Sequence, residues 1–85
     1  MNKYTVALSK SVEKQLDRLP DKVVSQIIAI LQALGNEPRP HGYKKLINRP
    51  GYRVRKGDYR IVYDIYDKVL IVEIISIGNR RDVYD

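Results

Sequence analysis

Cysteine is absent from this 85-residue chain, only one histidine is present, and no long stretch is continuously apolar. Without cysteine, a disulfide framework and a thiolate metal site are excluded, and the composition fits a reducing cytoplasm. The N-terminal stretch MNKYTVALSKSVEK lacks the apolar run of a signal peptide, and no segment approaches membrane-spanning length. We therefore expect a cytoplasmic protein with no membrane segment.

Motifs that bind a cofactor or form a catalytic triad are also missing from the chain. There is no glycine-rich phosphate loop, no set of His, Asp and Glu at metal-binding spacing, and no Ser-His-Asp arrangement. The single histidine, His41, stands in a loop rich in proline and glycine, where we expect it to be exposed. It would matter to function only if that loop folded over the arginines described below. We predict no metal and no cofactor.

Acidic side chains are scarce in the middle of the chain, which has a net charge of +6 overall. Residues 1–40 carry six basic and four acidic side chains, residues 41–63 carry seven and one, and residues 64–85 carry three and five. The basic excess therefore lies in one middle segment. It indicates an anionic partner, which charge alone leaves open as nucleic acid, an anionic membrane or an acidic protein.

Hydrophobic periodicity predicts one small α+β domain over residues 1–85. Ser9 is placed to cap a first helix, Pro20 separates it from a second, and Gly35 is expected to cap the end of the second. Proline and glycine make residues 35–51 irregular. The predicted elements are a strand at 4–8, helices at 10–19 and 21–35, and strands at about 52–56, 59–66 and 69–77. This βααβββ order predicts an antiparallel sheet packed against an N-terminal helical hairpin.

The stretch GYRVRKGDYRIVYDI reads as two alternating strands joined by a turn at residues 57–58. In that register Arg55 lies opposite Arg60 and Arg53 lies opposite Val62, so the three arginines share the exposed face of the sheet. A second turn at residues 67–68 would place Glu73 opposite Val62, where it could hold one arginine. The alternating partners on the other face are predicted to meet the helices: Tyr52, Val54, Tyr59, Ile61 and Tyr63.

Arginines that face one another call for a reason, because like charges directly opposite on neighbouring strands destabilise the pair. One interpretation is that basic residues only keep a strand edge soluble. The other is that an anion binds between them, and a planar guanidinium suits the oxygens of a phosphate group. We favour the phosphate interpretation, because a facing pair, a diagonal third arginine and a basic loop occur together.

The segments NEPRPHGYKKL, GYRVRKGDYRIVYDI and IISIGNRRDVY, together with the βααβββ order, resemble the RelE/ParE superfamily of toxin–antitoxin toxins. The resemblance covers nearly the whole chain and is strongest to the RelE branch of ribosome-dependent mRNA interferases. It implies a RelE-like fold and a metal-independent endoribonuclease that cleaves mRNA in the ribosomal A site. Its implied partners are the ribosome with its mRNA and a cognate antitoxin that holds the toxin inactive.

The resemblance also implies a set of site residues. In RelE-like toxins catalysis is attributed to basic residues on the strand after the loop, an arginine on the next strand, an arginine past the last strand and a tyrosine near the C-terminus. In this chain these positions are Arg53, Arg55, Arg60, Arg80 and Tyr84. The nearby side chains expected to bind RNA are Lys44, Lys45, Lys56 and Arg81.

This chain departs from the family pattern in two ways. RelE itself has lysines where this chain has Arg53 and Arg55, and a guanidinium does not deprotonate, so a lysine-type general base is lost. Many relatives have a histidine after the glycine that follows the last strand, where this chain has Asn79. These changes leave the identity of the proton-transfer groups open. Two further hypotheses remain open: a ParE-like inhibitor of DNA gyrase, and a non-catalytic RNA- or ribosome-binding protein.

A stripe of basic residues marks the first predicted helix, where Lys10, Lys14 and Arg18 recur every four residues. Its simplest interpretation is a solvated face in which these residues alternate with acidic ones. The functional interpretation is contact with ribosomal RNA. The acidic residues concerned are Glu13, Asp17 and Asp21.

Overall fold

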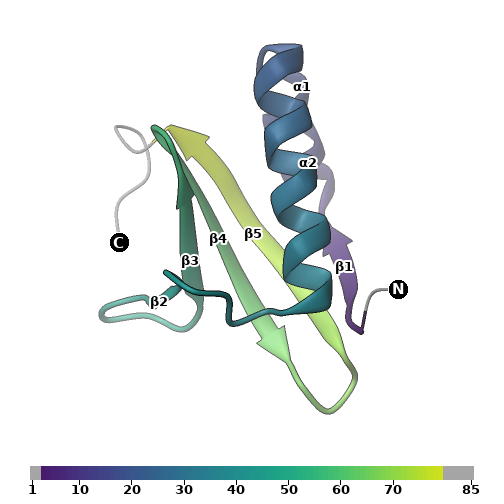
Figure 1. Ribbon diagram of the computed structural model, residues 1–85, viewed down its shortest axis with the longest axis vertical. Coiled ribbons are helices and arrows are strands. Elements are labelled where there is room, and N and C mark those ends of the chain that lie inside the picture. The colour runs from purple at the N-terminus through teal and green to yellow at the C-terminus, as the bar shows by residue number, and fades with distance from the viewer. Residues whose placement is uncertain (1–2, 80–85) are drawn as a thin grey trace.

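The computed structural model describes residues 3–79, which form seven elements (Figure 1). They are β1 (Thr5–Leu8), α1 (Lys10–Asp17), α2 (Asp21–Asn36), β2 (Lys44–Lys45), β3 (Tyr52–Lys56), β4 (Tyr59–Tyr66) and β5 (Ile71–Asn79). The α+β class and the βααβββ order are confirmed, with the two-residue strand β2 as an addition that the sequence did not predict. The bounds of β3 and β4 agree with the prediction.

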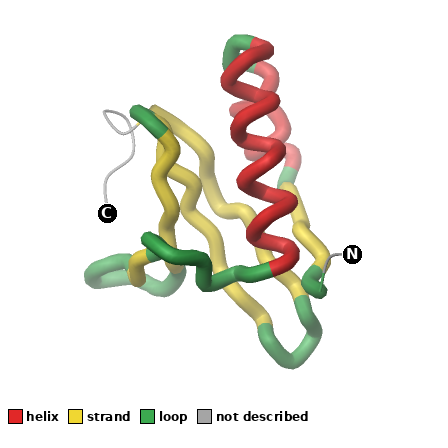
Figure 2. Tube along the Cα trace, viewed as in Figure 1, coloured by secondary structure: helices red, strands yellow, loops and turns green. Residues whose placement is uncertain are grey.

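The sheet has the strand order β1-β5-β4-β3-β2, and the two helices pack on one of its faces (Figure 2). Neighbouring strands run antiparallel, except that β1 runs parallel to β5, with Thr5 opposite Ile71 and Leu8 opposite Ile74. The predicted antiparallel sheet therefore contains one parallel pair at its edge. β4 is the central strand, so both of its edges pair with neighbouring strands.

The two helices begin where the sequence indicates. Ser9 caps α1, since its hydroxyl oxygen accepts a hydrogen bond from the backbone N–H of Val12 at 3.1 Å. The expectation that Gly35 ends the second helix is wrong, because α2 continues to Asn36 with Glu37 as its C-cap. Gly35 is buried inside the helix, and its carbonyl accepts a hydrogen bond from the N–H of Tyr4 at 2.7 Å. This bond joins the end of α2 to the residue that precedes β1.

The turn between β4 and β5 is longer than predicted. Four residues, 67–70, form the turn, and a β-bulge shifts the register between Val62 and Tyr63. As a result Val62 lies opposite Ser76, and Glu73 lies opposite Asp64. The expectation that Glu73 stands opposite Val62 is therefore wrong.

The core lies between the helices and the sheet. Residues from both helices and from three strands, β3, β4 and β5, are buried in it, and Val12, Ile27, Ile61, Tyr63 and Val72 are fully enclosed. As predicted, Val54, Ile61 and Tyr63 point toward the helices, which fixes the opposite face of β3 and β4 as the one the helices leave uncovered. Within residues 3–79, no helix is long and apolar enough to cross a membrane.

Candidate functional site

Three arginines gather on the uncovered face of the sheet, and we call Arg53, Arg55 and Arg60 the arginine face. Arg55 lies directly opposite Arg60, and Arg53 lies opposite Val62, as the position of the β3–β4 turn predicted. The turn is tight because Gly57 adopts a φ of +58°, which glycine tolerates. The register prediction is confirmed, so two guanidinium groups face one another across two strands.

Arg60 differs from its neighbours in burial. Its relative exposure is 7%, whereas Arg55 is exposed and Arg53 is half-buried. Arg60 belongs to β4, the central strand of the sheet. Burial restricts the rotamers of a long side chain, and a charge held in place needs little reorganisation when an anion binds. Arg60 is thus the fixed member of the pair and Arg55 the adaptable one.

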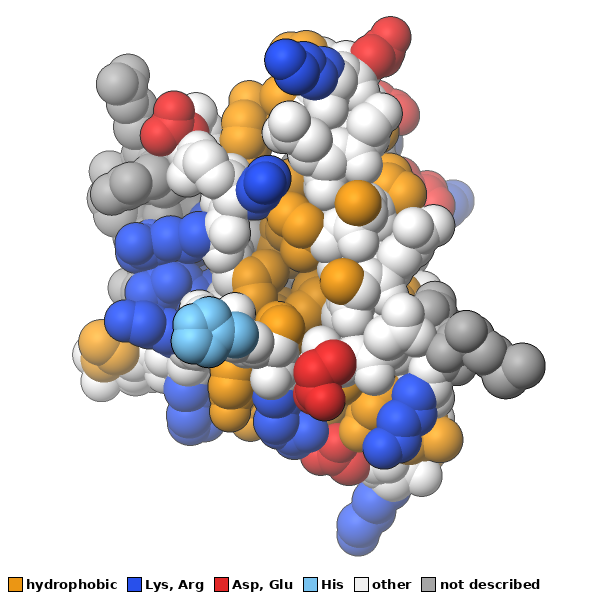
Figure 3. Space-filling model, viewed as in Figure 1, with side chains coloured by type: hydrophobic (Ala, Val, Ile, Leu, Met, Phe, Trp, Pro, Cys, Tyr) orange, Lys and Arg blue, Asp and Glu red, His pale blue; other side chains and the backbone are white. Residues whose placement is uncertain are grey.

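The lysines expected to bind RNA are divided between the two faces. Lys44, on β2, lies opposite Arg53 and extends the basic surface across the sheet. Lys45 lies opposite Tyr52 on the other face, where its ammonium group stands 5.6 Å from the centre of the Tyr52 ring. Lys56 pairs with Tyr59 at the end of β3 and is exposed beside the turn. In Figure 3 one group of Lys and Arg side chains lies on the β2–β3 side of the molecule, and others lie over the helices and near the β4–β5 turn.

The ring of Tyr52 lies between the core and the β2 side of the sheet. Its ring stands 5.7 Å from that of Tyr43 and 6.0 Å from that of Tyr63, measured between centroids. These tilted contacts are favourable for aromatic pairs. They cover the part of the core face that the helices do not reach.

The loop between α2 and β2 is tied to the core face, not to the arginine face. The buried hydroxyl of Tyr63 donates a hydrogen bond to the carbonyl oxygen of Pro38 at 2.6 Å. Burial raises the pKa of Tyr63 well above its usual value, so the hydroxyl stays protonated and remains a donor. Because Tyr63 points toward the helices, this bond ties the first part of the loop to the core face, and His41 further along the loop is exposed, as predicted.

Three hydrogen bonds to Asp67, which we call the Asp67 clamp, join this loop to the β4–β5 turn. Arg39 donates to both carboxylate oxygens of Asp67, at 3.3 and 2.8 Å, and the hydroxyl of Tyr4 donates to the same carboxylate at 2.6 Å. The Arg39 guanidinium, together with the Tyr4 hydroxyl, lowers the pKa of Asp67 to about 2. The clamp therefore connects the start of β1, the loop and the hairpin turn at neutral pH.

A residue that the sequence reasoning missed positions the end of β5. The side-chain oxygen of Gln15 on α1 accepts a hydrogen bond from the backbone N–H of Ile77 at 2.8 Å. The next residue, Gly78, lies opposite Arg60. Gln15 thereby fixes the last part of the strand beside the arginine face. No local sequence signal marks it, because its partner is distant in the chain.

Three of the predicted site residues, Arg80, Arg81 and Tyr84, lie outside the described residues. The last described residue, Asn79, pairs with Tyr59 at the end of β5. Within residues 3–79, no group of three His, Asp or Glu side chains is placed to hold a metal ion. The predicted site residues that the structure describes are Arg53, Arg55, Arg60, Lys44, Lys45 and Lys56.

Comparison with known proteins gives a consistent picture. A family model described as "ParE toxin of type II toxin-antitoxin system, parDE" matches residues 6–84. Toxin RelE of Mycobacterium tuberculosis (strain ATCC 25618 / H37Rv) is 35% identical over 83 residues, which cover 95% of this chain and 86% of that protein. Toxin RelG of the same organism is 28% identical over 83 residues, which cover 95% of each protein.

Solved structures show the same relationship. The archaeal RelE–RelB complex from Pyrococcus horikoshii OT3 contains a chain that matches with a TM-score of 0.83 and 29% identity, covering 95% of this chain and 99% of that one. The toxin–antitoxin complex RelBE2 from M. tuberculosis matches with a TM-score of 0.82 and 28% identity, covering 94% of each chain.

Proposed function

Because this chain belongs to the RelE/ParE superfamily of type II toxins and is RelE-like in sequence and fold, we propose that it is a ribosome-dependent mRNA endoribonuclease. It is the toxin of a RelBE-type toxin–antitoxin module. The observation that carries the proposal is the facing pair of Arg55 and Arg60 on the uncovered face of the sheet. Such a pair is destabilising by itself and becomes favourable when a phosphate binds between the two guanidinium groups.

The reaction that suits this site is attack of the RNA 2′-hydroxyl on the adjacent phosphorus. It needs the hydroxyl in line with the phosphorus, stabilisation of the charge on the phosphorane, and proton transfer at the 2′ and 5′ oxygens. Arg60 holds the non-bridging phosphate oxygens from a fixed position, and Arg55 supports it from the opposite strand. Arg53 and Lys44 bind the neighbouring phosphates.

Proton transfer has to come from other groups, because guanidinium groups do not titrate near neutral pH. Asn79 can orient a reacting group but cannot exchange a proton. Of the predicted catalytic residues, only Tyr84 carries a hydroxyl that can act as the acid or base, and Arg80 stabilises the leaving oxygen. These two assignments come from the family resemblance alone.

The partners in this proposal are the ribosome with its mRNA and a cognate antitoxin. Solved relatives include RelE chains in complex with RelB antitoxins. We propose that this toxin is likewise held inactive by an antitoxin protein in the cytoplasm, and that its release arrests translation.

The experiment that tests the function is primer extension on a reporter mRNA, with and without translating ribosomes, comparing the wild type with Arg60→Ala and Lys44→Ala. We expect cuts within codons only when ribosomes are present. Removing a clamp that acts on the phosphorane should slow single-turnover cleavage about 100-fold or more. Lys44→Ala should mainly raise the ribosome concentration needed for half-maximal cleavage, because it removes a peripheral phosphate contact.

Either of two results would contradict the proposal. Equal effects of the Arg60 and Lys44 substitutions on the single-turnover rate would remove the assigned role of Arg60. The absence of cuts from folded, antitoxin-free protein in both conditions would rule out ribosome-dependent cleavage.

A second candidate function is inhibition of DNA gyrase, because the matching family model is described as the ParE toxin. ParE-like chains generally lack the catalytic residues of the RelE pattern, which favours the first proposal. A gyrase supercoiling assay separates the two. Dose-dependent inhibition by protein that leaves ribosomal mRNA intact would establish the ParE-like function instead.

A further inference from the structure

A row of tyrosine rings runs from the core to the β2 side of the sheet. Tyr63 is buried, whereas Tyr52 and Tyr43 are half-buried. The Tyr52 ring contacts both of the others, so Tyr43, in the loop before β2, is the outermost ring of the row. We call Tyr43, Tyr52 and Lys45 the aromatic edge. It lies on the face of the sheet opposite the arginine face, because Lys45 pairs with Tyr52.

The aromatic edge combines rings with an available positive charge. Lys45 is exposed, its ammonium group stands 5.6 Å from the centre of the Tyr52 ring, and among the described residues it makes no ion pair. The backbone beside Tyr43 borders open space, because a Cβ added to Gly42 would meet none of the described atoms within 4 Å. A planar group can therefore approach Tyr43 from outside.

Strand β2 connects the aromatic edge to the arginine face. It is the last strand on this side of the sheet (Figure 1). Lys44 lies opposite Arg53 on the arginine face, and its neighbour Lys45 points to the other face, since side chains alternate along a strand. Residues 38–57 contain no acidic side chain. Positive charge therefore continues from one face to the other around β2.

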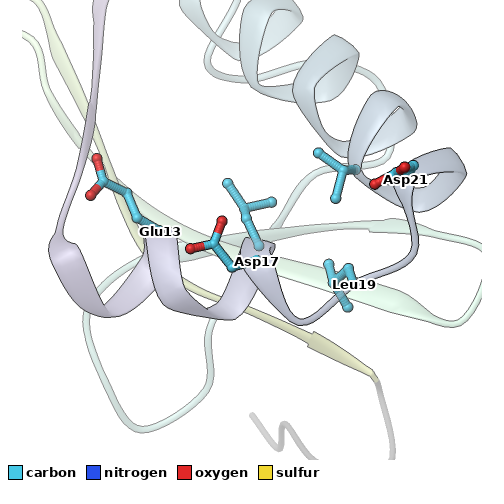
Figure 4. Close-up of a pocket in the computed structure, with 6 residues that line it drawn as sticks. Glu13, Asp17, Leu19 and Asp21 are labelled. Carbon is cyan, nitrogen blue, oxygen red and sulfur yellow. The ribbon is translucent and has the colours of Figure 1, made fainter.

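The α1 side of the molecule is a different environment. Glu13 and Asp17, with Asp21 at the start of α2, line a hollow of about 470 Å³ (Figure 4). Lys14 and Arg18 are exposed beside these carboxylates, so α1 has the mixed charged face of the simpler sequence interpretation. Carboxylates repel a polyanion. Electrostatics therefore favour β2, and not this hollow, as the route of an RNA strand that leaves the arginine face.

Rings beside basic side chains suit single-stranded RNA. Its unpaired bases stack on aromatic side chains while its phosphates bind cations. In a duplex the bases are already stacked on one another, and recognition relies mostly on shape, phosphates and 2′-hydroxyl groups. An aromatic ring at a basic edge therefore favours the single strand.

We propose that the aromatic edge binds single-stranded RNA, with a base stacked on Tyr43 and a neighbouring phosphate held by Lys45. Tyr52 supports the Tyr43 ring from the core side. That this RNA is the part of the mRNA next to the cleaved phosphate rests on the proposed function, whereas the binding of a single strand does not. The aromatic edge positions the strand and takes no part in bond breaking.

The first test uses fluorescence. The chain contains no tryptophan, so Tyr43→Trp introduces a single indole, whose emission a stacked base quenches. The probe is a single-stranded RNA of about ten nucleotides, with 2′-O-methyl groups that prevent cleavage. We expect quenching that saturates as this RNA is added. The matched control is Tyr66→Trp, at the exposed end of β4, which should not be quenched.

The second test separates stacking from charge by using an abasic oligonucleotide of the same length, which keeps the phosphates and lacks the bases. Tyr43→Leu should weaken binding of the intact RNA about five- to 100-fold, the range of one lost base stack. It should change binding of the abasic strand by less than about twofold. Lys45→Gln should weaken both strands alike and lower the slope of log affinity against log salt by about 0.7.

Thermal unfolding checks that the variants fold, and Tyr43→Phe, which keeps the ring, should bind like the wild type. If Tyr43→Leu does not fold, the fluorescence test and Tyr43→Phe decide in its place. Equal weakening of the intact and abasic strands by Tyr43→Leu, or a Tyr43→Trp signal that intact RNA does not quench, would overturn the proposal.

Failure of this proposal is distinguishable from failure of the proposed function. Ribosome-dependent cleavage by a wild type whose Tyr43→Trp variant shows no quenching would leave the function standing and overturn the aromatic edge. Quenching by the intact but not the abasic strand, from a protein that cleaves no mRNA on ribosomes, would do the reverse.

Discussion

The hydrogen bond between Tyr63 and Pro38 should stabilise the fold by an amount that a single substitution can measure. The change is Tyr63→Phe, which keeps the ring and removes only the hydroxyl that donates to the Pro38 carbonyl at 2.6 Å. Both residues are buried, so the carbonyl is left without a donor and away from water. A buried acceptor that loses its partner costs about 1 to 3 kcal/mol. We expect a loss of about 1 to 2 kcal/mol in the free energy of unfolding.

The assay is thermal and urea unfolding of the wild type and the variant. For a domain of this size the expected loss corresponds to a fall in Tm of roughly 4 to 16 °C. Tyr66→Phe is the matched control on the same strand, because the Tyr66 hydroxyl is exposed and makes only a 3.3 Å hydrogen bond to Glu73. It should change stability by less than about 0.5 kcal/mol. Equal losses in the two variants would refute the reasoning.

The buried hydroxyl of Tyr63 also makes the stability of the protein depend on pH in the alkaline range. Burial raises the pKa of Tyr63 in the folded protein, so the unfolded chain loses that proton first as the pH rises. Stability from this group is complete below the ordinary tyrosine pKa, about 10, and is lost progressively above it. Tyr63→Phe should therefore flatten the alkaline limb of the stability curve. An alkaline limb as steep as that of the wild type would contradict this assignment.

Two further predictions concern the turns and clamps around the sheet. Asp67→Asn should reduce the loss of stability that the wild type shows between pH 4 and pH 2. The lowered pKa of Asp67 makes the stabilisation by this carboxylate complete above about pH 4, and it is lost as the pH falls toward 2. Urea unfolding across this pH range measures the effect, and an acid limb as steep as that of the wild type would contradict the prediction. Gly51→Ala should cost about 1 kcal/mol or more, because Gly51 has a φ of +111° and a Cβ there would stand 3.1 Å from the carbonyl oxygen of Tyr63. Gly42→Ala, with a φ of +90° and no atom within 4 Å of the added Cβ, should cost less, and a larger loss there than at Gly51 would show that contact with Tyr63 is unimportant.

The β3–β4 hairpin was predictable because the sequence constrains it twice. The glycine of the two-residue turn fixes the pairing, and the alternation of apolar and basic residues admits only one face toward the helices. That is why Arg55 was correctly placed opposite Arg60 from the sequence. The arginine face was predictable for the same reason, since both constraints are local.

Features that depend on distant contacts were not predictable. The bulge after Val62 leaves no residue signature, and it places Ser76 opposite Val62. β2 is too short to show an alternation, and it forms because β3 offers it an edge. A glycine at position 35 predicts the end of a helix, yet the N–H of Tyr4 donates a hydrogen bond to the Gly35 carbonyl and α2 continues to Asn36. In each case the deciding partner lies far away in the chain.

The pairing of β1 with β5 bears on the order in which this chain can fold during synthesis. It joins Thr5 to Ile71, so the first strand finds its partner only when nearly the whole chain has been made. Contacts between distant residues also slow folding, because the entropy of closing the loop is lost before the contact forms. The helical hairpin can form early, but its apolar face has no complete sheet to cover until β5 emerges. We therefore expect the growing chain to lack a completed core between the helices and the sheet until β5 has left the ribosome.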